Sequence, residues 1–127
     1  MKIIDGIKYT KEHEWVKIEG NEAKIGITDF AQHNLGDIVF VELPKVGADF
    51  KAGDSIGVVE SVKSVSDIFS PIHGTVFKVN EALSEKPEKL NEDPYGSWIA
   101  VLKVKEIKED SGLMDSAAYA AFCETEG

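Results

Sequence analysis

The feature that most constrains the fold is a symmetrical pattern between residues 57 and 70, where two apolar runs flank a short polar centre containing Lys63. Two such runs joined by about two residues are typical of a β-hairpin. Antiparallel pairing about Val62 and Lys63 places Glu60 opposite Val65. We therefore predict a hairpin with a two-residue connection and a lysine at its tip.

The turn is unusual for a hairpin because it contains neither Asn-Gly nor Gly-Gly, the residues that supply positive φ in tight connections. Three interpretations of Lys63 follow: an ordinary solvated lysine, a Schiff-base lysine, or the acceptor of a prosthetic group. A Schiff-base lysine needs a lowered pKa. The carboxylates of Glu60 and Asp67 would instead favour the charged amine. An amine presented alone on a stiff arm favours the acceptor interpretation.

The chain also contains one approximate duplication of about forty residues. Residues 38–41 match residues 75–78, and residues 55–59 match residues 97–101. Each copy is rich in Val, Ile and Phe and is bounded by turn residues. We therefore predict a mainly β fold, a flattened antiparallel β-sandwich with pseudo-two-fold halves. Lys63 would lie on the turn that ends the first half.

Two helices are expected beside the sheets. Thr28 is a good N-cap for a short helix near residues 28–35, and Gly36 follows at the position that favours glycine. Asp115 is a plausible N-cap for a C-terminal helix over residues 116–123. A further single helical turn is expected near Pro87.

We expect one domain spanning residues 1–127, with a core of about residues 15–104 and a C-terminal helical extension of about residues 111–124. A buried strand is predicted over residues 98–102. The alternating charges of residues 103–110 suggest that the chain leaves the sheet there.

The charge of the chain argues against some classes of function. The net charge is −9, and all fourteen cations are lysine. An acidic chain without arginine is a poor binder of nucleic acid and of anionic membranes. No apolar run could cross a bilayer. Residues 1–5 lack the features of a signal or transit peptide, so a cytoplasmic protein is expected, or a mitochondrial-matrix one if the chain is a processed eukaryotic protein.

Ordinary enzyme chemistry has little support in the sequence. Cys123 is the only cysteine, and His13, His33 and His73 lie in different elements without metal-ligand spacing. No phosphate-binding loop or nucleophile-elbow motif is present. We therefore expect no catalytic residues and no metal site.

The run Glu60-Ser61-Val62-Lys63, followed by Ser66-Asp67 and by Ser70-Pro71-x-x-Gly74, resembles the lipoyl-bearing segment of the glycine cleavage system H-protein family. The resemblance extends over nearly the whole chain. Its other motifs are His13-Glu14-Trp15-Val16, Ile25-Gly26-Ile27-Thr28-Asp29, Ala31-Gln32, Leu35-Gly36-Asp37, Phe40-Val41-Glu42-Leu43-Pro44 and Asn91-x-x-Pro94-Tyr95.

This resemblance implies the lipoyl/biotinyl type of sandwich and a carrier without turnover of its own. Lys63 would hold lipoic acid in amide linkage, and Glu60 would be the main charged contact of the lipoate-attaching enzyme. Glu14 and Asp67 would help retain the arm when it carries a protonated amine. The implied partners are a pyridoxal-phosphate glycine decarboxylase, a tetrahydrofolate-dependent aminomethyltransferase, dihydrolipoamide dehydrogenase and lipoate-attaching enzymes.

Two departures and several alternatives accompany the resemblance. Phe30 stands where the family usually has histidine, and Ser64-Val65 stand where many members have Ala-Ala or Ala-Thr. The lipoyl domain of a 2-oxo acid dehydrogenase typically has Asp-Lys-Ala at its tip. A biotin carrier has Met on both sides of its lysine, where this chain has Val62 and Ser64. An H-like relay that passes lipoyl groups to other enzymes, and an unmodified interaction module, stay open.

Overall fold

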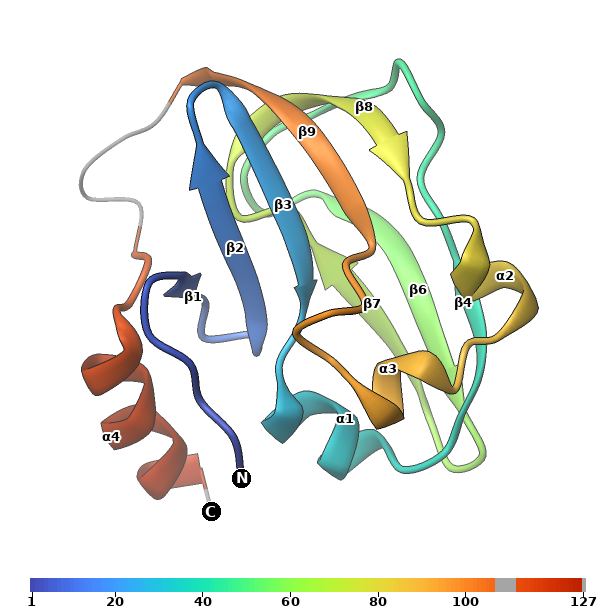
Figure 1. Cartoon of the computed structure of the whole chain (residues 1–127), viewed down its shortest axis with the longest axis vertical. Coiled ribbons are helices and arrows are strands. Elements are labelled where there is room, and N and C mark those ends of the chain that lie inside the picture. Colours follow the sequence, from blue (N-terminus) through green and yellow to red (C-terminus); the bar gives the residue numbers. More distant parts are fainter. Residues whose placement is uncertain (107–111, 127) are drawn as a thin grey trace.

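Two antiparallel sheets form a sandwich in the computed structural model, which describes residues 1–106 and 112–126 (Figure 1). The strands of the larger sheet are, in spatial order, β1 (Lys8–Tyr9), β2 (Glu14–Glu19), β3 (Glu22–Ile27), β9 (Ala100–Glu106), β8 (His73–Val79) and β5 (Asp49–Phe50). Those of the smaller sheet are β4 (Ile38–Glu42), β6 (Ser55–Ser61) and β7 (Val65–Phe69). The predicted fold class is confirmed.

One apolar core lies between the two sheets. Side chains of a strand alternate between its two faces, so every second residue can point inward. Val41, Val59 and Ile68 contribute from the smaller sheet and pack in one cluster with Ile25 and Leu102 of the larger sheet. All five are almost fully buried. Burial of this apolar surface supplies the main driving force for folding.

The predicted hairpin register is confirmed. Glu60 lies opposite Val65 across the β6–β7 pair, and Gly57 lies opposite Ile68. On the other side of β6, Glu60 lies opposite Phe40 of β4. Because Val59 faces the core, the neighbouring row Phe40–Glu60–Val65 faces away from it.

The duplication appears in the strand pairing. Val41 pairs with Val59 in the first half, and the matching residues Lys78 and Val101 pair in the second. Each pair of strands also contains a register irregularity within its matched segment. A similar sequence has therefore produced a similar pairing twice, as expected of pseudo-two-fold halves.

Both capped helices are confirmed. Helix α1 (Asp29–Leu35) begins after Thr28, whose side chain accepts a hydrogen bond from the amide of Ala31 at 3.2 Å. Gly36 ends it with a positive φ of 78°. Helix α4 (Ser116–Glu126) begins after Asp115, whose carboxylate accepts from the amide of Ala118 at 2.8 Å.

The prediction of a single helical turn near Pro87 needs correction, and two strands have bounds that were not predicted. The connector around Pro87 contains two short helices, α2 (Ala82–Glu85) and α3 (Lys89–Glu92), because a helical turn forms on each side of the proline. Strand β8 begins at His73, within the motif Ser70-Pro71-x-x-Gly74. The short strand β1 pairs with β2 and carries no clear apolar alternation, so its sequence gives little signal.

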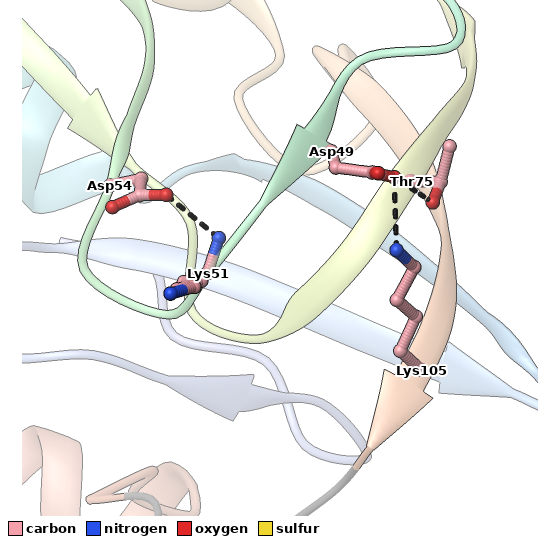
Figure 2. Close-up of polar contacts among 5 residues, drawn as sticks. All are labelled: Asp49, Lys51, Asp54, Thr75 and Lys105. Atoms are coloured by element: carbon pink, nitrogen blue, oxygen red, sulfur yellow. Dashed lines mark hydrogen bonds and ion pairs between the residues drawn. The ribbon is translucent and has the colours of Figure 1, made fainter.

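The prediction that the chain leaves the sheet at Lys103 is wrong. Strand β9 runs from Ala100 to Glu106, and Lys103 pairs with Glu22 of β3 and Thr75 of β8. The alternating charges mark a strand with one solvated face. There Lys103 forms an ion pair with Glu22 at 2.7 Å, and Lys105 forms one with Asp49 at 3.1 Å (Figure 2). Residues 107–110 of this prediction lie outside the described residues.

A second apolar cluster attaches the N-terminal segment and α4 to the edge of the larger sheet. Tyr9 and Tyr119 stack with their ring centroids 4.3 Å apart, and Trp15 belongs to the same buried cluster. Figure 1 shows α4 beside β1, on the opposite side of the molecule from the β6–β7 turn. Within the described residues, no helix is long and apolar enough to cross a membrane.

Candidate functional site

The turn that carries Lys63 is closed mainly by Ser61. The amide of Ser61 donates to the carbonyl oxygen of Ser64 at 2.8 Å. The Ser61 hydroxyl oxygen accepts from the amides of Ser64 at 3.1 Å and Lys63 at 3.3 Å. Neither Val62 nor Lys63 has a positive φ. The turn needs no Asn-Gly because neither central residue adopts a positive φ, and the Ser61 side chain supplies the hydrogen bonds that close it.

The tip also rests on the connection between α1 and β4. The amide of Val62 donates to the carbonyl of Asp37 at 3.0 Å, and Ser61 pairs with Ile38. A Cβ placed on Gly36 would lie 3.5 Å from the Cε of Lys63, so the lysine stem passes over this glycine. Figure 1 shows the tip beside the α1–β4 connection.

Lys63 and Glu60 are both accessible at this tip. Lys63 is exposed, and its amine forms no ion pair with the described residues. Glu60 is half-buried on β6, on the same outward row as Phe40 and Val65, which are 49% and 66% exposed. The two exposed apolar side chains and one carboxylate next to the amine form a surface that another protein could contact.

Glu14 is buried at the start of β2, next to the end of β7 that is farther from Lys63. Its Oε2 accepts from the amide of Phe69 at 2.8 Å, and its Oε1 accepts from the hydroxyl of Thr10 at 2.9 Å. Burial raises the pKa of the Glu14 carboxyl to about 7, although these two hydrogen bonds act in the opposite direction. Near neutral pH this side chain is therefore poised between its two protonation states.

A surface hollow of about 290 Å³ opens beside Glu14. Glu12 and Phe69 also line it, so the structure brings Glu12 and Glu14 together as acidic neighbours. Asp67 does not line this hollow. It is exposed on β7, two residues before Phe69, and its carboxylate accepts from the hydroxyl of Ser55 at 3.0 Å. Asp67 is therefore between the tip and the hollow along the strand.

His13 holds the chain in an unusual conformation next to Glu14. Its φ of 65° is the only positive value of a non-glycine residue in the described part of the chain. Its carbonyl accepts from the amide of Thr28 at 3.1 Å, and its Nδ1 is 2.8 Å from the hydroxyl of Tyr119. Its ring stacks on Phe30 at a centroid distance of 4.3 Å. Phe30 therefore contributes to packing around His13.

Three residues of this region were not predicted. Thr10 and Tyr119 orient Glu14 and His13, and Ser61 closes the turn. Ser61 has a local signal, since a serine at the start of a tight turn commonly bonds the backbone two residues on. Tyr119 has none, because it is 106 residues from His13 in sequence.

Another hollow, of about 440 Å³, lies beside β5, and its carboxylates are already engaged. Asp49 accepts from Thr75 and Lys105, and Asp54 accepts from the amide of Lys51 at 2.8 Å (Figure 2). These contacts stabilise a turn and the neighbouring strands. They give no indication of a ligand.

Comparison with known proteins agrees with this β-sandwich fold. A sequence model of the family described as "Glycine cleavage H-protein" matches residues 7–126. The glycine cleavage system H proteins of Thermoanaerobacter pseudethanolicus and Alkaliphilus oremlandii are 51% and 55% identical to this chain. Each alignment covers 99% of this chain, with 100% of the first relative and 99% of the second.

A solved structure gives the same result. The crystal structure of a glycine cleavage system H protein from Mycobacterium marinum superposes with a TM-score of 0.88 at 37% sequence identity, covering 96% of this chain and 99% of the other. The fold is that of a carrier domain of the lipoyl class. The chain belongs to the glycine cleavage H-protein family.

The buried Glu14 predicts an unusual pH dependence of stability. Its pKa is raised from 4.5 to about 7 in the folded state, so the folded protein binds more protons than the unfolded chain between these values. Stability should therefore fall as pH rises from 4.5 to about 7, by on the order of 3 kcal/mol from this group. Urea denaturation across this range measures the effect.

Glu14→Gln is the informative variant because it is neutral and keeps an acceptor for the amide of Phe69. It should remove the decline, so that above pH 7 the variant is more stable than the wild type. Glu88→Gln, on the exposed surface, is the matched control and should preserve the decline. Parallel pH profiles for wild type and Glu14→Gln would show that folding does not raise the pKa of Glu14.

Proposed function

We propose that this chain is the lipoyl-carrying H protein of the glycine cleavage system, with lipoic acid attached to Lys63 through an amide bond. The observation that carries the proposal is the exposed Lys63 amine, which has no ion-pair partner among the described residues, on a turn braced by Ser61 and Asp37. Family membership supports it, since relatives at about half identity bear that name over their full length.

The residues around Lys63 fit an acylated lysine. Acylation removes the positive charge of the amine, and no ion pair with the described residues is lost. Gly36 carries no side chain, so the stem of Lys63 has room beside the α1–β4 connection. When attached, the lipoyl group supplies a dithiolane on a long arm that can accept and pass on the aminomethyl group of glycine.

The chain itself supplies presentation. The sandwich holds the arm, and the enzymes act on it in turn: the pyridoxal-phosphate decarboxylase, the tetrahydrofolate-dependent aminomethyltransferase and dihydrolipoamide dehydrogenase. Tethering raises the local concentration of the arm at each partner. Glycine–bicarbonate exchange with the purified decarboxylase tests this role. Exchange supported by the lipoylated chain is expected, and its absence would favour the relay or the unmodified interaction module.

Lys63→Arg should abolish lipoylation without affecting the fold. The substitution keeps a positive charge at an exposed turn, where changes usually alter stability by about 0.5 kcal/mol or less. Intact-mass spectrometry after incubation with a lipoate ligase, lipoate and ATP should show no added mass. The double variant Lys63→Ser with Ser64→Lys tests position, and it too should stay unmodified. Acylation of either variant at another lysine would contradict the assignment.

Glu60→Ala should slow lipoylation while leaving the melting temperature nearly unchanged. The carboxylate lies half-buried beside the tip without a hydrogen bond or ion pair to the described residues, so its removal costs the fold little. Initial rates of lipoylation should fall, because an enzyme that approaches the tip loses a charged contact. Glu42→Ala, an exposed carboxylate at the end of the neighbouring strand, is the matched control. Equal rates for wild type and Glu60→Ala would show that exposure of the amine is sufficient.

Glu14 and Asp67 should hold the end of the arm when it carries a protonated amine. Asp67 lies on β7 between Lys63 and the hollow beside Glu14, so the arm could follow this strand. An approaching cation favours the ionised form of Glu14 and should lower its raised pKa. One partly exposed ion pair contributes at most ~1 kcal/mol, or roughly a fivefold change in the docked fraction.

The lifetime of the protein loaded by glycine and the decarboxylase measures this retention. At low salt, where surface electrostatics are strongest, Glu14→Gln and Asp67→Asn should each shorten the lifetime by up to about fivefold. Glu88→Gln should leave it unchanged. If both site variants match the wild type, shielding of the arm depends on apolar packing instead.

A further inference from the structure

The position of the Lys63 turn is set from outside the hairpin. Both residues of the α1–β4 connection touch it: Gly36 lies under the Lys63 stem, and the carbonyl of Asp37 accepts from the amide of Val62 at 3.0 Å. Ile38, the first residue of β4, begins the pairing with β6. A displacement of this connection would therefore move the tip with it.

The connection is in turn held by one side chain from a distant part of the chain, Asn91 of α3. Its Oδ1 accepts from the amide of Ile38 at 2.9 Å. Its Nδ2 donates to the carbonyl of Gly36 at 2.8 Å and to Oε1 of Gln32 at 3.0 Å. The amide group thus bonds the residues on both sides of Asp37, whose carbonyl holds the tip.

The orientation of the Asn91 amide follows from its partners. The backbone amide of Ile38 can only donate, and the carbonyl of Gly36 can only accept, so oxygen and nitrogen cannot be exchanged. Loss of this side chain would leave both backbone groups without their partner in a half-buried region. An unsatisfied backbone group is costly, so the connection would rearrange toward water.

We propose that Asn91 is a positioning residue for the acylation of Lys63, acting through the α1–β4 connection; this inference rests on the proposed function of Lys63. Among the described residues, the Asn91 side chain bonds Gln32, Gly36 and Ile38 and forms no hydrogen bond with Lys63. It keeps the Asp37 carbonyl in place, and Asp37 keeps the Val62 amide and hence the turn in place. The turn needs this support, because its own closure relies on Ser61.

Loss of this support should lower the fraction of molecules whose Lys63 turn has the conformation that the attaching enzyme binds. If only a fraction of molecules presents the turn correctly, the apparent affinity of the enzyme for the carrier falls by that fraction. The carrier KM for lipoylation should therefore rise, while kcat at saturating carrier stays near the wild-type value. A general loss of stability would not produce this separation at a temperature where the variant is fully folded.

The test compares Asn91→Ala with Asn80→Ala. Asn80 is a matched control, since it is also half-buried and its Nδ2 donates to a loop carbonyl, that of Trp98, at 2.8 Å. Lipoylation kinetics are measured with a lipoate ligase, lipoate and ATP at varied carrier concentration. Amide hydrogen exchange of Val62 is measured in parallel.

Asn91→Ala should raise the carrier KM and the exchange rate of the Val62 amide by about tenfold each, with kcat within about twofold of wild type. Asn80→Ala should leave all three unchanged. Gln32→Ala, which removes only one partner of Asn91, is the milder variant and should give an intermediate KM even if Asn91→Ala does not fold. The inference would be overturned if Asn91→Ala had the wild-type KM, or if Asn80→Ala raised the KM equally. If Asn91→Ala does not fold, a wild-type KM in Gln32→Ala would overturn it.

The two proposals fail differently. If the wild-type chain is not acylated at Lys63, the proposed function is wrong, whatever the Val62 amide shows. If the wild type is acylated and Asn91→Ala is acylated with the same KM, only the positioning role is wrong.

Discussion

Presentation of Lys63 depends on the backbone hydrogen bond between the amide of Val62 and the carbonyl of Asp37. The hairpin alone would not hold the turn in one conformation, because an isolated two-stranded hairpin is only marginally stable in water. The pairing of β4 with β6 continues up to Ser61 and ends one residue before this bond. The sheet therefore fixes the hairpin, and the bond from the α1–β4 connection fixes its tip.

Much of this arrangement could be predicted from the sequence, because it depends on local patterns. The register of β6 and β7 follows from the side-chain period of two in a strand. The first residues of α1 and α4 follow from the capping residues Thr28 and Asp115. Strand β9 could not be bounded in this way. Its outward lysines look like the start of a solvated loop until partners such as Glu22 and Asp49 are known.

The residues of the candidate site could be predicted from the sequence, but their arrangement in space could not. The resemblance indicates Glu14, but only the fold shows that Glu14 is buried with the amide of Phe69 as its partner. That bond joins the larger sheet to the smaller one, so it depends on how the sheets pack. The same holds for Asp67, which does not line the hollow although Ser70 and Pro71 of its sequence motif do.

Burial of Glu14 opposes stability at neutral pH, and the surrounding structure compensates for it. An ionised carboxylate without a cationic partner is costly inside a protein, and the raised pKa expresses that cost. The left-handed conformation of His13 adds local strain directly beside it. Both are held in place by packing from the second cluster, where Tyr119 of α4 contacts His13 and stacks on Tyr9.

The position of α4 therefore has a consequence for the site. The hydroxyl of Tyr119 also lies 2.7 Å from the hydroxyl of Thr28, which caps α1. One tyrosine therefore links α4 to the side chain of His13, next to Glu14, and to the first helix. Helix α1 leads directly into the connection that holds the Lys63 turn. Lys63 lies just before the start of β7, and Glu14 bonds the amide of Phe69 at its end. The surroundings of both residues are thus stabilised through contacts that include α1.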